Sequence, residues 1–183
     1  MNRRAALKMT AHVMGGTIVG ATFFLSSCKN PSTSTGMISP DDIAMLDEIG
    51  ETILPESILS PGAKAARIGE FMKAIVEDCY TTEEAQTFMD GIIKINDLSR
   101  NTYKKRFVDL NAQQRADMLT IVDKESRSWK NDKEEHFFMM MKQLTVWGYF
   151  TSQPGATQAL RYNPIPGRYE ACIPYTPGES AWS

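Results

Sequence analysis

The sequence predicts a mainly α-helical protein, a small helical domain followed by an extended Gly/Pro/Tyr-rich C-terminal tail. Apolar residues recur at helical spacing between residues 39 and 150. No segment alternates apolar and polar residues as a half-buried strand does, and no internal repeat is visible. From Thr151 onward, proline and glycine recur too often for a long helix or an inner strand.

Composition indicates one ordinary globular domain. The chain has 183 residues, of which 42 % are hydrophobic and 23 % charged, with a formal net charge of −2. Three cysteines are too few for a disulfide-rich scaffold. Residues 1–27 hold three of the 20 basic residues and none of the 22 acidic ones, so the remainder carries a net charge of −5. This balance argues against nucleic acid as a partner.

Residues 1–27 have the anatomy of an export signal. Arg3, Arg4 and Lys8 form a basic opening, and Met9 to Ser27 is mostly apolar or small. The arginine pair resembles a twin-arginine (Tat) signal, which serves proteins exported already folded. A permanent membrane span is the competing interpretation, but three glycines and a histidine dilute the apolar stretch.

The end of this segment resembles a bacterial lipobox. In Leu25-Ser26-Ser27-Cys28 the cysteine would receive a diacylglyceryl thioether and become the new first residue. Acyl chains on Cys28 would anchor the exported protein to the membrane on the periplasmic or extracellular side. Residues 28–38 then form a flexible polar tether, and residues 39–183 form the single folded domain.

Capping signals and apolar stripes predict four helices before the tail. They run from Ser39 to Pro55, from Ile68 to Cys79, from Thr81 to Leu98 and from Asn111 to Val122. Thr81 with Glu84, and Asn111 with Gln114, have the spacing of helix N-termini. The charged segment from Lys124 to His136 is expected to be a solvated connection.

The last predicted helix, Phe137 to Phe150, is apolar nearly all round. It is too short to span a bilayer, so it is either central in the fold or covered by a partner. Nine of the 15 aromatic residues after Cys28 lie between Phe137 and Trp182. Core packing explains part of this enrichment, and contact with a partner is the functional interpretation. The candidate interface residues are Trp147, Tyr149, Phe150, Pro154 and Tyr169.

Motifs that carry chemistry are missing from the sequence. His136 is the one histidine after Cys28, which excludes a histidine metal cluster and a bis-histidine haem. There is no dinucleotide-binding glycine motif and no nucleophile elbow. We therefore expect no catalytic, cofactor-binding or metal-binding residues in this chain. His136 is expected at the surface, and the pairs Asp41-Asp42 and Glu83-Glu84 are expected at helix starts.

Cys79 and Cys172 leave three possibilities open. They form a disulfide with each other, stay as buried thiols, or bridge to another subunit. The extracytoplasmic location predicted above would expose both to oxidising conditions.

Several short motifs, in this order, resemble one known family. Besides the twin-arginine pair, they are Thr52-Ile53-Leu54-Pro55, Pro61-Gly62-Ala63, Phe107-Val108-Asp109-Leu110 with Gln114, the segment from Gly148 to Ala156, and Tyr169-Glu170-Ala171-Cys172. This pattern resembles the gluconate 2-dehydrogenase subunit 3 family, the small subunits of membrane-bound gluconate 2-dehydrogenases. The likeness runs from about Ser39 to Cys172.

The resemblance implies a function that the residues alone do not show. Members of the family accompany a large flavoprotein of the glucose–methanol–choline (GMC) class, which holds FAD and oxidises a sugar or polyol. A cytochrome c often takes the electrons. The small subunit holds no cofactor, and it helps the flavoprotein to fold, to be exported and to stay in place. The lipobox at Cys28 departs from the general family pattern and adds a lipid anchor.

Two other functions compete with this interpretation. A stand-alone envelope lipoprotein with a structural or ligand-binding role would be a stable monomer without a flavoprotein partner. A catalytic enzyme would have to work without histidines, metal motifs or a nucleotide-binding motif.

Overall fold

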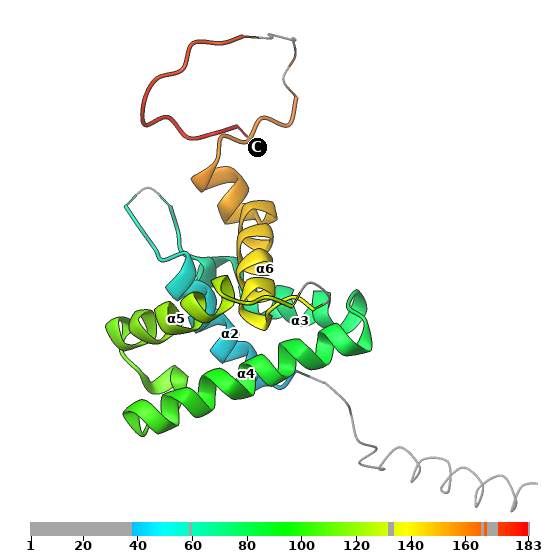
Figure 1. The fold of residues 1–183 in the computed structure, drawn as a ribbon. Helices are drawn as coiled ribbons and strands as arrows, with labels where there is room; N and C mark the ends of the chain where they lie inside the picture. Colours follow the sequence, from blue (N-terminus) through cyan, green and yellow to red (C-terminus); the bar gives the residue numbers. More distant parts are fainter. Residues whose placement is uncertain (1–37, 59, 132–133, 166, 168–171, 183) are drawn as a thin grey trace, which may run out of the picture. The chain divides into compact units, whose positions relative to one another are not determined.

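A computed structural model of the chain describes residues 38–58, 60–131, 134–165, 167 and 172–182 (Figure 1). Its α-helices are α2 (Pro40–Ile53), α3 (Ile68–Asp78), α4 (Thr82–Tyr103), α5 (Ala112–Arg127) and α6 (Phe137–Thr151). Short helical turns are η2 (Ala63–Ala66), η3 (Phe107–Asp109) and the π-helical η4 (Gly155–Ala159). Within the described residues no β-strand forms beyond two isolated bridges. The prediction of a mainly α-helical fold is therefore confirmed.

Capping side chains decide where three of the helices begin. Capping boxes pair Ser39 with Asp42, Thr81 with Glu84, and Asn111 with Gln114. In each, one side chain accepts from an otherwise unpaired backbone N–H while the other accepts from the cap's own N–H. Such a cap stabilises a helix by about 1 kcal/mol. The predicted starts of α4 and α5 are confirmed, and both helices extend five residues beyond their predicted ends.

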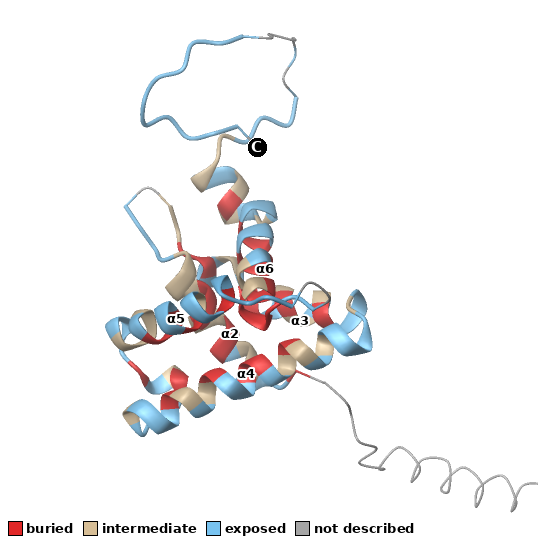
Figure 2. Ribbon diagram, viewed as in Figure 1, coloured by how far each residue is buried: buried red, intermediate tan, exposed pale blue. Residues whose placement is uncertain are grey.

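Helix α6 lies at the centre of the core. It contacts α2, α3, α4 and α5, and Figure 2 shows buried residues gathered where these helices meet. Its buried residues are Phe137, Phe138, Met140, Met141, Leu144, Thr145, Gly148 and Tyr149. The all-round apolar character of this helix therefore reflects a central position, one of the two alternatives that the sequence left open.

One half-buried cation ties three elements together. Arg115 of α5 forms an ion pair with Glu48 of α2. It also donates to the backbone carbonyl of Val108, in η3, at 2.7 Å. Lys64, which follows the loop after α2, pairs with the same Glu48 carboxylate at 2.5 Å. Two cations on one carboxylate fix α2 against α5 and against η2.

The expectation for His136 was wrong. The residue is 4 % exposed, and it forms the N-cap of α6 with its Nδ1 accepting from the Phe138 backbone N–H at 3.2 Å. Its ring lies against Trp129 and Phe137, with centroid distances of 5.2 and 4.3 Å. The charged residues around it in the sequence indicated a solvent-exposed position, but these two aromatic rings enclose the imidazole.

Candidate functional site

The exposed side of α6 carries three large apolar side chains near its C-terminal end. Val146, Trp147 and Phe150 are 44, 53 and 38 % exposed, and we call them the aromatic surface. They share one face because residues three and four positions apart are neighbours on a helix. An exposed tryptophan and phenylalanine on a central helix are typical of an interface anchor.

Contacts with α3 position Trp147. Its ring meets the edge of Phe71 with a centroid distance of 5.4 Å and an interplanar angle of 85°. Gly148 lets the two helices come this close, since a Cβ at that position would lie 2.4 Å from Phe71 Cδ1 and 2.6 Å from Ile68 Cδ1. The glycine in the motif Gly148-Tyr149-Phe150 therefore serves the packing that supports the aromatic surface.

Gly148→Ala is expected to lower the free energy of unfolding by about 1–2 kcal/mol, because overpacking against α3 outweighs the better helix propensity of alanine. Urea denaturation of the variant measures this loss. Val146→Ala, on the exposed side of the same helix, serves as the control and should stay within about 0.5 kcal/mol of the wild type. Equal stabilities of the two variants would contradict the close approach of α6 to α3.

Tyr149 does not belong to the aromatic surface, although the sequence placed it in the candidate interface. It is 2 % exposed, and its hydroxyl donates to the Pro61 carbonyl and lies 2.5 Å from the Ser60 hydroxyl oxygen. Its neighbour Trp147 points outward while Tyr149 turns into the core. Tyr149 therefore holds the loop between α2 and η2 against α6.

After α6 the chain turns into η4 and the tail. Pro154 is partly buried and immediately precedes η4. A Cβ on Gly155 would lie 1.9 Å from the Tyr149 carbonyl oxygen, so this tight turn requires glycine. Five large apolar side chains of the tail are exposed: Tyr162, Ile165, Ile173, Tyr175 and Trp182. Tyr169 lies outside the described residues.

The two described cysteines are free and exposed. Cys79 is the C-cap of α3, and Cys172 lies in the tail. Their exposure contradicts one of the three alternatives, in which both stay as buried thiols. A disulfide, within the chain or to another subunit, stays a prediction.

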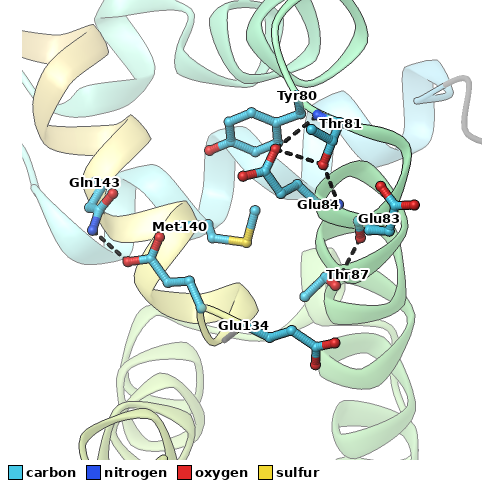
Figure 3. Close-up of a pocket in the computed structure, with 9 residues that line it drawn as sticks. Tyr80, Thr81, Glu83, Glu84, Thr87, Glu134, Met140 and Gln143 are labelled. Atoms are coloured by element: carbon cyan, nitrogen blue, oxygen red, sulfur yellow. Dashed lines mark hydrogen bonds between the residues drawn. The ribbon is translucent and has the colours of Figure 1, made fainter. Parts of the chain in front are cut away.

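A pocket lies between the start of α4 and the first turns of α6 (Figure 3). Its volume is about 380 Å³, with Tyr80, Glu83, Glu84, Glu134 and Met140 in its lining. Burial raises the pKa of Tyr80, and the nearby carboxylates of Glu135 and Glu84 raise it further. The pocket therefore has a negative potential around an aromatic ring.

One acid of each pair at the helix starts caps its helix. The Glu84 carboxylate accepts from the Thr81 backbone N–H at 2.8 Å, and this bond lowers its pKa. Asp42 accepts in the same way from Ser39 at 3.0 Å. Both acids are capping residues, as the sequence predicted. No group of three histidine, cysteine or acidic side chains that could hold a metal occurs in the described part of the chain.

Comparison with known families gives one match. The family model described as gluconate 2-dehydrogenase subunit 3 matches residues 40–167. The chain belongs to the gluconate 2-dehydrogenase subunit 3 family. No curated protein and no solved structure matches it significantly. The resemblance seen in the sequence is therefore confirmed.

The matched segment of this subunit 3 family member contains all five described α-helices and the aromatic surface. The family name indicates a subunit of a gluconate 2-dehydrogenase-like complex. Of the predicted interface residues, the structure brings Trp147 and Phe150 together at the surface. Arg3, Arg4 and Cys28 lie outside the described residues. Among the helices in the described part of the chain, none combines the length and the hydropathy that a membrane span needs.

The buried imidazole of His136 was not predicted from the sequence. The Nε2 atom of His136 is buried and has no hydrogen-bond partner among the described residues. Burial lowers the pKa of His136, and the nearby Glu125 carboxylate offsets this in part. A histidine directly before a long apolar run is the one sequence signal for a buried cap.

Acid is expected to destabilise this subunit through His136. Below about pH 6.5 the imidazole of the unfolded chain gains a proton, whereas the buried ring, with its lowered pKa, stays neutral. The unfolded state then binds more protons, so the free energy of unfolding falls as the pH falls through this range. Urea denaturation at several pH values measures the slope.

His136→Asn is the matched variant for this prediction, because asparagine still caps α6 but does not titrate. Its stability should depend less on pH between about 7 and 5 than that of the wild type. Identical slopes for both proteins would show that His136 does not couple folding to pH.

Proposed function

We propose that the chain is the non-catalytic accessory subunit of an extracytoplasmic FAD-dependent sugar or polyol dehydrogenase. The observation that carries the proposal is the aromatic surface, which lies within the segment matched by the subunit 3 family. A central helix that keeps Trp147 and Phe150 exposed offers a partner two rigid anchors of the kind that dominate protein interfaces.

The partner in this proposal is a GMC-type flavoprotein that holds the FAD and performs the oxidation. This chain supplies no cofactor ligand and acts by binding. A cytochrome c that accepts the electrons is a further member of the proposed complex. The exposed aromatic side chains of the tail add contact area beyond the aromatic surface.

The N-terminal motifs give the accessory subunit its proposed role in export and attachment. The Arg3-Arg4 pair would direct the folded chain, with its bound flavoprotein, through the twin-arginine route. Acyl chains on Cys28 would then hold the complex at the membrane, since two or more chains give stable anchoring. The subunit thereby supports the folding, export and attachment of its partner.

Fractionation of cells that express defined variants tests this proposal. With the wild-type chain, FAD-dependent sugar or polyol dehydrogenase activity should be found in the extracytoplasmic membrane fraction. Cys28→Ala should move this activity to the soluble extracytoplasmic fraction. Replacing both Arg3 and Arg4 by lysine should leave it inside the cell. Activity that stays membrane-bound and exported with both variants would contradict the proposed role.

A further inference from the structure

Three adjoining hollows lie along α4, on residues that the proposed function does not use. Their volumes are about 380, 200 and 560 Å³. The first and second hollows share Thr87 and Glu134, and the second and third share Asp90 and Lys94. The hollows therefore lie next to one another along α4, and together we call them the α4 groove. None of its lining residues belongs to the aromatic surface.

Negative charge dominates the α4 groove. Its lining includes six carboxylates that form no ion pair with any described residue: Glu83, Glu84, Asp90, Asp97, Glu134 and Glu135. Lys94 is the one cation among the described lining residues, and Glu125 neutralises it at 2.6 Å. The groove is therefore complementary to a cationic ligand.

Exposed apolar side chains accompany these carboxylates. Ile93 of α4 and Ile121 of α5 are both 57 % exposed in the third hollow, and Trp129 of the second hollow is 46 % exposed. Apolar contacts alternating with carboxylates favour a segment that has both apolar and basic side chains, rather than a simple metal ion or a small polar molecule.

His136 adds an independent sign of an absent ligand. It lines the second hollow, and because its Nδ1 accepts from the Phe138 backbone N–H, its Nε2 carries a proton. This donor is buried, has no hydrogen-bond partner among the described residues and lies 3.9 Å from the Glu125 carboxylate. A polypeptide segment in the groove would bring carbonyl oxygens near this donor, and because Nε2 is closed to solvent they bind it only when the ring turns toward the groove.

We propose that the α4 groove docks a basic amphipathic segment of a partner protein. The carboxylates select lysine or arginine side chains, and Ile93, Ile121 and Trp129 take up the apolar face of the segment. This surface is separate from the aromatic surface, so the accessory subunit can contact partner proteins through two different sets of residues.

Binding of two designed peptides to the full chain tests the proposal. The probe is a fluorescent helical peptide with leucine on one face and lysine on the other, and the comparison peptide has glutamate in place of lysine. The lysine peptide should bind, and its affinity should fall as salt is added, whereas the glutamate peptide should not bind. Equal binding of both peptides, or binding of neither, would overturn the proposal.

Matched double variants locate the binding site. Asp90→Asn with Asp97→Asn should weaken binding of the lysine peptide by about three- to tenfold. The control is Asp117→Asn with Asp78→Asn, outside the groove. Asp117 is well matched to Asp90, because each accepts a 2.8 Å bond from the glutamine four residues earlier. Equal effects of the two double variants would show non-specific attraction and would also overturn the proposal.

Discussion

Arg115→Ala is expected to lower the free energy of unfolding by about 2–4 kcal/mol, because it leaves a half-buried carboxylate without its closest cation. The Arg115 and Glu48 side chains are 16 and 19 % exposed, so water replaces the lost contacts poorly. The Val108 carbonyl loses its 2.7 Å bond in the same variant, and the Phe107 ring loses a guanidinium at 6.0 Å. Chemical denaturation measures the loss.

An exposed ion pair provides the control for this prediction. Arg106 and Asp109 form a bidentate pair three residues apart, with side chains 54 and 48 % exposed. Arg106→Ala should lower the free energy of unfolding far less than Arg115→Ala does, because solvated ion pairs contribute little to stability. If Arg115→Ala were as mild as Arg106→Ala, the tie between α2, η3 and α5 would not hold the fold together.

Trp147→Asp combined with Phe150→Asp is expected to weaken binding of the flavoprotein by about a hundredfold or more. Truncating a central aromatic anchor typically removes 2 kcal/mol or more of binding free energy, and each aspartate adds a desolvation penalty at the contact. Co-purification of the flavoprotein with tagged wild-type and variant chains, compared at equal expression, measures the loss.

A matched control separates binding from folding in this experiment. Ile58→Asp also places a carboxylate on a fully exposed apolar position, in the loop after α2 and outside the aromatic surface. It should retain the partner, and all three chains should show the same helical circular dichroism. Retention of the flavoprotein by the double variant would show that the aromatic surface is not the interface.

Helix starts could be predicted from the sequence because capping is local. Ser39, Thr81 and Asn111 each meet their partner three residues later, so no distant contact is needed to fix these helix ends. For α6 the sequence left two alternatives, a central position or a partner that covers it, since an apolar stretch without a polar face has to be covered.

Which aromatic side chain of α6 faces outward could not be predicted. Trp147 and Tyr149 are two positions apart in an apolar helix, and periodicity alone does not choose between them. The choice depends on two contacts with residues distant in sequence. One is the close approach of α3 to Gly148, and the other is the hydrogen bond that the Pro61 carbonyl accepts from the Tyr149 hydroxyl. The prediction that His136 is exposed was wrong for a related reason, because the rings of Trp129 and Phe137 bury it within a charged segment.

The central claim, that this subunit 3 family member acts by binding a flavoprotein, can be tested directly in native membranes. The tagged full-length chain is isolated in mild detergent, and the absorbance spectrum and protein composition of the eluate are recorded. We expect a larger protein to co-purify with flavin absorbance and with dehydrogenase activity toward a sugar or polyol. A single colourless species without such a partner would contradict the account and would favour a stand-alone envelope lipoprotein.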